Sequence, residues 1–135
     1  MIDVIRSGDI KLVPERFDST YFYWVENLQD WCISRQIWWG HRIPVYYRDG
    51  ETKVSLQHLE VSDGWEQDPD TLDTWFSSAL WTWSTLIDPE LAKNYSLSMK
   101  ELLERSPDFQ KFHPTNIMET GYDILFFWVA RMILM

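Results

Sequence analysis

Cysteine, glycine and basic residues are all scarce in this 135-residue sequence, and the shortages exclude several classes of protein. The single cysteine, Cys32, allows no disulfide framework and no cysteine-ligated zinc site. With 12 basic against 21 acidic side chains, the net charge of −9 gives no general attraction to phosphate. A nucleic acid would therefore have to be bound by local arginines or by basic surfaces elsewhere. The lone thiol fits a reducing, cytosolic setting.

Signal peptides and long apolar runs are also missing. The first ten residues carry three charged side chains, unlike a secretory signal. The most apolar run, residues 124–135, is too short for a membrane span and contains Arg131. Because that run stops while still apolar and without a C-cap, we expect the sequence to be a fragment of a longer polypeptide.

Aromatic residues, by contrast, are abundant, at 16% of the sequence with nine tryptophans. This composition excludes a disordered chain and indicates a piece of an aromatic-rich core. The hydrophobic pattern predicts a mixed α/β order, with a helix beginning at Pro14 and a capping box of Ser98 with Glu101. Strands are expected at residues 10–13, 43–47, 52–59 and 116–119, a turn at 49–50, and further helices within 74–85, 89–94, 98–105 and 123–135.

The segment DWCISRQIWWGHRIPVYY (Asp30–Tyr47) is the first of three whose residue types are suited to ligand binding or catalysis. Its arginines offer planar donors for phosphate or carboxylate, and its tryptophans offer flat faces for stacking. It therefore suits a nucleic-acid end or a phosphorylated ligand. The structural alternative is the edge of a core in which arginine stems pack on indoles.

The second segment is DPDTLDTWFSSALWTWSTL (Asp68–Leu86). It mixes carboxylates, hydroxyls and large aromatic rings, and Asp73 is placed to cap a helix through the backbone of Thr74 and Trp75. Capping alone explains Asp73. Trp75 is either a core residue or the wall of a pocket.

The third segment, HPTNIMETGYDILFFWVARMI (His113–Ile133), is the most suggestive. Gly121 lets a ligand approach the backbone, and Asp123 at a helix start is suited to accept hydrogen bonds from a sugar hydroxyl pair. Ile124 and Trp128 are four residues apart, so one helix face would present both as an apolar socket. In the structural alternative, Asp123 is an N-terminal cap and the other two are core residues.

Common catalytic constellations are incomplete in this sequence. There is no phosphate loop with its lysine, no glycine-rich dinucleotide fingerprint and no nucleophile elbow. The three histidines, His41, His58 and His113, are scattered, which predicts no metal site.

Taken together, the three segments resemble valyl-tRNA synthetases, a family of class I aminoacyl-tRNA synthetases. Three long motifs occur in the family's order and spacing, and the WWGH, DTWFSSALW and TGYDILFFW stretches separate this family from its isoleucine and leucine siblings. The family's HIGH and KMSKS signatures, its editing domain and its anticodon-binding region do not occur here. The resemblance therefore implies an internal fragment of a Rossmann-type catalytic domain, taken from after the editing insertion and decorated by a β-hairpin.

The resemblance also implies a role for each segment. Residues 1–48 would return from the editing insertion, residues 49–67 would form a hairpin without the zinc that many relatives carry there, and residues 68–135 would belong to the catalytic domain. The full protein would be a cytoplasmic ligase that uses ATP, with Mg²⁺, to activate valine and transfers it to tRNA(Val), with no membrane involved. Misacylated threonine would be removed elsewhere in the full chain.

By position, the site residues would divide among three ligands. Trp75, Ile124 and Trp128 would line the valine side-chain pocket; Gly121 and Asp123 would face the ATP ribose; Ser34, Arg35, Gln36 and Trp39 would lie near the tRNA acceptor end. No residue of this fragment would be catalytic, and the fragment alone is expected to be inactive. Two alternatives stay open, a non-catalytic RNA or protein interaction module derived from a synthetase, and a fragment of an isoleucine synthetase.

Overall fold

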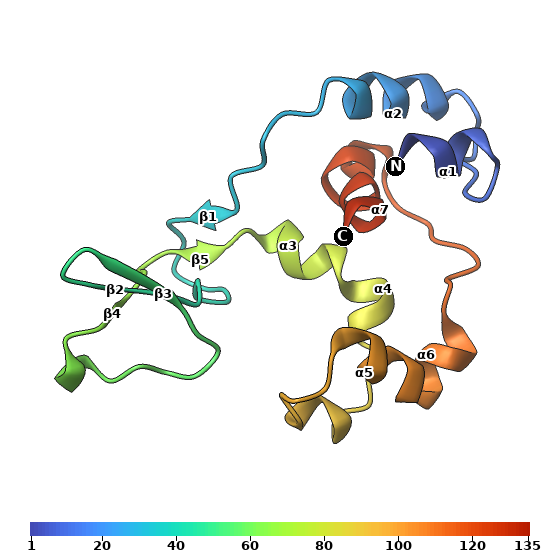
Figure 1. Cartoon of the computed structure of the whole chain (residues 1–135). Coiled ribbons are helices and arrows are strands. Elements are labelled where there is room, and N and C mark those ends of the chain that lie inside the picture. The colour runs from blue at the N-terminus through green and yellow to red at the C-terminus, as the bar shows by residue number, and fades with distance from the viewer. The chain divides into compact units, whose positions relative to one another are not determined.

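The computed structural model describes residues 1–135, and the chain divides into two compact units. Unit 1 comprises residues 1–29 and 77–135, and unit 2 comprises residues 30–76. Every strand belongs to unit 2, whereas the regular elements of unit 1 are all helices (Figure 1). The chain is therefore a mixture of helices and small antiparallel sheets. No helix reaches the length and apolarity that crossing a membrane requires.

The core of unit 1 joins the first and last segments of the chain. Helices α1 (Ile2–Arg6) and α2 (Phe17–Glu26) come from the start. The end supplies a 3₁₀ turn, η3 (Tyr122–Ile124), a π-helix, η4 (Leu125–Ala130), and α7 (Arg131–Leu134). Their apolar faces meet in one cluster whose buried members are Ile5, Tyr21, Leu125, Val129 and Ala130. Burial of these side chains is what holds the two distant segments together.

The rest of unit 1 is a series of short helices. They are α4 (Trp81–Ser84), the 3₁₀ turn η2 (Leu91–Lys93), α5 (Met99–Arg105) and α6 (Pro107–Phe112). The predicted capping box is present, because Ser98 Oγ accepts from Glu101 N and the Glu101 carboxylate accepts from Ser98 N at 2.8 Å. Buried Ser106 ties the series together, donating to Leu102 O at 2.7 Å and accepting from Asp88 N at 2.9 Å.

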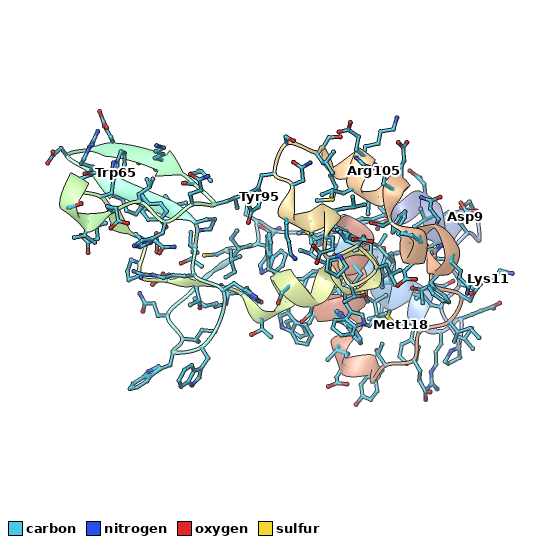
Figure 2. The ribbon with its side chains drawn as sticks, turned by 90° about the horizontal axis from the view of Figure 1, so that it is seen from below. Asp9, Lys11, Trp65, Tyr95, Arg105 and Met118 are labelled. Carbon is cyan, nitrogen blue, oxygen red and sulfur yellow. The ribbon has the colours of Figure 1, made fainter.

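Unit 2 contains a three-stranded antiparallel sheet in the order β3-β2-β4. Strands β2 (Val45–Arg48) and β3 (Glu51–Val54) form the predicted hairpin, and β4 is Glu66–Gln67. The turn residues Asp49 and Gly50 have φ of 48° and 85°, the positive values that a tight two-residue hairpin turn needs. Trp65, labelled on this sheet in Figure 2, packs its ring 4.4 Å from the Arg48 guanidinium.

A second, two-stranded sheet in unit 2 joins residues far apart in the sequence. Strand β1 (Ser34–Arg35) runs antiparallel to β5 (Thr71–Leu72), with Ser34 opposite Leu72 and Arg35 opposite Thr71. Backbone bonds extend the pairing, because Asp73 N donates to Ile33 O and Leu72 N donates to His41 O, both at 2.7 Å. Helix α3 (Thr74–Ala79) follows β5 directly.

Several sequence predictions of secondary structure are wrong. Residues 10–13 and 116–119 form no strand, because no neighbouring segment pairs with their backbone. A Rossmann-type parallel sheet is therefore not present within this chain. The return strand of the hairpin ends at Val54 rather than Leu59, and the expected loop at 62–70 contains β4. The final segment is helical as predicted, but it passes through 3₁₀, π and α geometry in turn.

Candidate functional site

Asp73 is the centre of the polar arrangement in unit 2. Its side chain is only 5% exposed and forms an ion pair with the Arg35 guanidinium. The other carboxylate oxygen accepts from Trp75 N at 2.7 Å, which confirms the predicted helix cap. Trp31 Nε1 donates to the same carboxylate at 3.4 Å. One buried carboxylate thus orients a cation, a helix start and an indole.

Most of the donors of Arg35 are used within this arrangement. In addition to Asp73, its guanidinium donates to the carbonyls of Cys32 at 2.6 Å and Ser34 at 2.8 Å. A charged group that is partly buried needs such partners to offset the loss of hydration. The guanidinium therefore fixes the backbone of its own segment and has few donors left for a ligand.

Ser34 is held in a similar way by a second acidic residue. Its hydroxyl donates to Asp70 Oδ2 at 2.5 Å, a short charge-assisted hydrogen bond. Asp70 is itself oriented by Asp68, whose Oδ1 accepts from Asp70 N at 2.9 Å. Tyr47 donates to the other Asp68 oxygen at 2.9 Å, and this hydrogen bond is the main reason that the pKa of Tyr47 is raised.

The loop between β1 and β2 carries the exposed part of the same segment. Trp38 and Trp39 are 93% and 86% exposed, and Gln36 is exposed beside them. Gly40 follows with a φ of 152°, and a side chain there would approach Thr71 to 3.2 Å. The loop therefore lies tightly against β5 at Gly40 while the two preceding indoles remain in solvent.

Trp75 and the residues of the final helix belong to different units. Trp75 is half-buried at the start of α3 in unit 2, whereas Gly121, Asp123, Ile124 and Trp128 lie in unit 1. Gly121, Asp123, Ile124 and Trp128 thus lie together in one segment of unit 1. The predicted participation of Trp75 in a shared pocket stays a prediction.

The carboxylate of Asp123 occupies the space that a side chain at Gly121 would need. Both are exposed, and a Cβ on Gly121 would lie 2.5 Å from Asp123 Oδ1. Such a distance is well inside van der Waals contact, so any side chain at position 121 would displace the carboxylate. The atom that would move is the end of an exposed side chain, so the shift itself is cheap, and the backbone φ of −61° does not require glycine. The cap residue of η3 is Gly121, so the alternative of Asp123 as the helix cap is wrong.

Ile124 and Trp128 are both half-buried, one at the end of η3 and the other within the π-helix η4. Trp128 Nε1 donates to Ser78 O at 2.8 Å, which satisfies the indole and fixes the direction of its ring. π-Helical turns are rare and occur often at functional sites. The predicted socket residues therefore lie on an unusual and well-anchored piece of backbone.

Two features of these sites were missed by sequence reasoning. The pairing of Arg35 with Asp73 spans 38 positions, and no local pattern links them. The exposure of Trp38 was missed because a tryptophan-rich segment is more commonly a core segment. The sequence did contain one indication of an exposed, cationic face, because residues 31–48 include no acidic side chain.

One surface hollow of about 260 Å³ lies elsewhere in unit 1. Its lining is mainly apolar and contains none of the predicted site residues; it comprises Trp83, Met99, Leu103, Phe109, His113 and Met135. No three or more His, Cys, Asp or Glu side chains gather closely enough to share a metal ion.

Comparison with known proteins identifies the class of this chain. The model for tRNA synthetases class I (I, L, M and V) matches residues 1–63 and 56–135. The chain therefore belongs to the class I tRNA synthetase family. No solved structure gives a significant match.

Within that class, similar curated proteins include valine--tRNA ligases. The one from Clostridium tetani is 55% identical over 98% of this chain, that from Bacillus subtilis is 51% identical over 95%, and that from Mycobacterium leprae is 48% identical over 98%. The chain is thus homologous to valine--tRNA ligases along almost its whole length. It spans only 13% to 14% of the length of these relatives.

Proposed function

We propose that this chain is the segment of a cytoplasmic valine--tRNA ligase that helps to form the valine and ATP sites. The whole ligase would join valine to ATP as valyl-adenylate and then transfer the valyl group to tRNA(Val). The observation that carries this proposal is the 55% identity to a valine--tRNA ligase over 98% of the chain. No observation favours the non-catalytic module or the isoleucine synthetase fragment, so neither is proposed.

In this proposal the final segment binds two substrates. Asp123 accepts hydrogen bonds from both ribose hydroxyls of ATP, and Gly121 leaves room for its carboxylate and for the sugar. Trp75, Ile124 and Trp128 line the valine side chain. The hydrogen bond from Trp128 to Ser78 O supports this role, because a fixed indole can exclude a larger side chain by size.

The proposed apolar pocket is limited in which amino acids it can exclude. An apolar socket cannot strongly reject threonine, which has the shape of valine with an added hydroxyl, and the valine enzyme is the standard example of this limit. Hydrolysis of the wrong product is therefore assigned to an editing domain elsewhere in the longer protein. Mg²⁺ would accompany ATP, and no residue of this chain is assigned to it or to zinc.

The proposed domain organisation follows the same scheme. Residues 1–48 would return from the editing insertion, residues 49–67 would be a zinc-free hairpin, and residues 68–135 would complete part of a Rossmann-type catalytic domain formed with the remaining chain. Ser34, Arg35, Gln36 and Trp39 would lie near the acceptor end of the tRNA. HIGH and KMSKS, which supply charge stabilisation for ATP activation in this family, do not occur in the sequence, so the chain alone should be inactive.

The proposal is tested in a full-length relative whose equivalent segment is exchanged for this chain. Valine-dependent exchange of pyrophosphate with ATP reports activation without tRNA. We expect Asp123→Asn to raise the KM for ATP by about tenfold or more, because one amide oxygen replaces a carboxylate that accepts two hydrogen bonds. Asp108→Asn, at an exposed carboxylate in α6, is the matched control and should leave that KM unchanged.

The amino-acid site is tested in the same assay by Trp128→Ala. Removing the indole should raise the KM for valine and reduce discrimination against isoleucine, whereas Trp81→Ala, at a 62% exposed tryptophan, should do neither. Unaltered discrimination in the Trp128 variant would refute the assignment of the socket. Exchange by the isolated chain would refute its expected inactivity.

A further inference from the structure

Trp38 and Trp39 form the most exposed aromatic surface of the chain. Their side chains are 93% and 86% accessible, whereas tryptophan normally buries most of its large apolar area. The two are adjacent in the sequence and lie in the loop between β1 and β2. Both indole faces are thus available to a flat ligand.

The loop that carries these indoles is anchored at both ends. At its start, Arg35 is paired with Asp73 and bound to two backbone carbonyls. At its end, the Arg42 side chain donates to Asp68 O at 2.9 Å and Gln67 O at 3.0 Å. Anchored loop ends lower the entropy cost of presenting Trp38 and Trp39 to a ligand.

The charge around the indoles favours an anionic ligand. Residues 31–48 contain Arg35, Arg42 and Arg48 but no Asp or Glu, although the whole chain has a net charge of −9. Arg35 and Arg48 are paired with the carboxylates of Asp73 and Glu51. The donors of Arg42 go to the neutral backbone carbonyls of Asp68 and Gln67, so among these three arginines it alone forms no ion pair.

We propose that Trp38 and Trp39 are a stacking platform for the unpaired bases of an RNA end, with Arg42 beside its phosphates. Flat faces next to a cation are the combination that binds single strands without reading their sequence. A partner protein would instead require a wide apolar surface around the indoles. Of their loop neighbours, only Ile37, at 43% exposure, is an exposed large apolar residue, whereas Gln36, His41 and Arg42 are exposed and polar or cationic.

This assignment changes the roles of the neighbouring residues. Ser34 and Arg35, which are bonded to Asp70 and Asp73, become positioning residues that hold the loop. Trp38, to which no role was assigned, becomes a contact residue together with Trp39. The identity of the RNA as the 3′ end of a tRNA rests on the proposed function, whereas the stacking surface does not.

The first experiment measures aminoacylation in the full-length relative that carries this segment. Trp38→Ala with Trp39→Ala should raise the KM for tRNA by about tenfold or more, since loss of one stacked base commonly costs that much. Pyrophosphate exchange, which needs no tRNA, should fall by a much smaller factor. Phe at both positions should restore much of the tRNA affinity and Leu should not, because Leu has no π-face.

Two outcomes of this experiment would overturn the proposal. One is an equal loss of exchange, aminoacylation and melting temperature, which would mean that other parts of the longer protein cover the indoles. The other is an unchanged KM for tRNA. Trp81→Ala, which removes an exposed indole outside the loop, is the matched control and should leave tRNA affinity unchanged.

A second experiment observes stacking directly in this chain labelled with fluorotryptophan. The probe is a short single-stranded RNA ending in CCA, added at low ionic strength, and fluorine NMR resolves the nine tryptophans once each is assigned by substitution. The resonances of Trp38 and Trp39 should shift and that of Trp81 should not. Binding should weaken little with salt, because few phosphates are neutralised. No shift at Trp38 or Trp39 would overturn the proposal.

The two experiments separate this proposal from the proposed function. If valine-dependent exchange is absent while RNA still shifts the two indole resonances, the ligase assignment fails and the platform stands. If exchange is present and depends on Asp123 but RNA has no effect on Trp38 and Trp39, the ligase assignment stands and the platform fails.

Discussion

The two units of this chain are stabilised by different forces. Unit 1 buries an apolar cluster, of which Ile5, Tyr21 and Leu125 come from three separate segments. In unit 2 the buried residues are Tyr46, Thr71 and Asp73, two of which are polar. Apolar burial tolerates inexact geometry, whereas a buried polar network depends on every partner being present. Unit 2 should therefore be the more sensitive of the two to single polar substitutions.

The largest loss of stability is expected from Asp73→Ala, in the polar network of unit 2. The substitution leaves the partly buried Arg35 unpaired and removes the cap of α3, so we expect a loss of about 3 kcal/mol in the free energy of unfolding. Denaturant unfolding followed by tryptophan fluorescence measures the loss. Asp30→Ala, at an exposed carboxylate of the same unit, should change stability by less than about 0.5 kcal/mol. Equal effects of the two variants would contradict the role of Asp73.

A slightly smaller effect is expected from Leu125→Ala in unit 1. Deleting this 8% exposed side chain removes apolar contact in the core, and we expect a cost of about 2.5 kcal/mol. Hydrogen exchange should show the loss of protection in α1, α2 and η4, with the β1–β5 pairing protected as before. Leu134→Ala, at a 49% exposed leucine of α7, is the control. Equal loss of protection in β1 and β5 would show that the two units unfold together.

An intermediate effect is expected from Ser34→Ala in unit 2. It removes the 2.5 Å hydrogen bond to Asp70, for which we expect a cost of about 1.5 kcal/mol. Asp70→Asn retains an acceptor and should cost less. If Ser34→Ala proves neutral by denaturant unfolding, the short hydrogen bond does not stabilise β1.

The smallest effect concerns the capping box of α5 and its pH dependence. Hydrogen bonds from Ser98 lower the pKa of Glu101 from its usual value of 4.5. Their contribution to the stability of the folded chain is therefore fully present above pH 4.5 and is lost as the pH falls through the lowered pKa. Ser98→Ala should cost about 1 kcal/mol at neutral pH and remove this dependence. Glu101→Gln keeps an acceptor and should flatten the pH profile. A variant profile as steep as that of the original chain would contradict the linkage.

Local chemistry made some elements predictable from the sequence. The spacing of Phe17 and Tyr21 predicted a helix, which the structure shows as α2, although this helix begins at Phe17 and not at Pro14 as predicted. Asp49-Gly50 predicted the hairpin turn because these residues accept positive φ, and Ser98 with Glu101 predicted a cap because their hydrogen bonds are local. Asp73 was predicted as a cap for the same reason.

Elements that depend on a distant partner were predicted poorly. Residues 116–119 have the composition of a strand, but a strand exists only where another backbone pairs with it, and none does here. Strand β4 was missed because Glu66 and Gln67 are poor strand formers that pair with an existing β2. The final segment was predicted only as a helix, because its π-helical turn is not encoded by any simple periodicity.

The sequence by itself indicated the family through a resemblance along the chain, and it predicted the hairpin turn and two helix caps because these depend on residue type at short separation. The residues for valine and ribose, which the resemblance implied, stay a proposal. Only the tertiary structure decided that Arg35 and Ser34 are bonded to Asp73 and Asp70 while Trp38 and Trp39 remain in solvent. The physical reason is that burial and pairing depend on which distant segments meet, and adjacent residues of one motif can therefore have opposite environments.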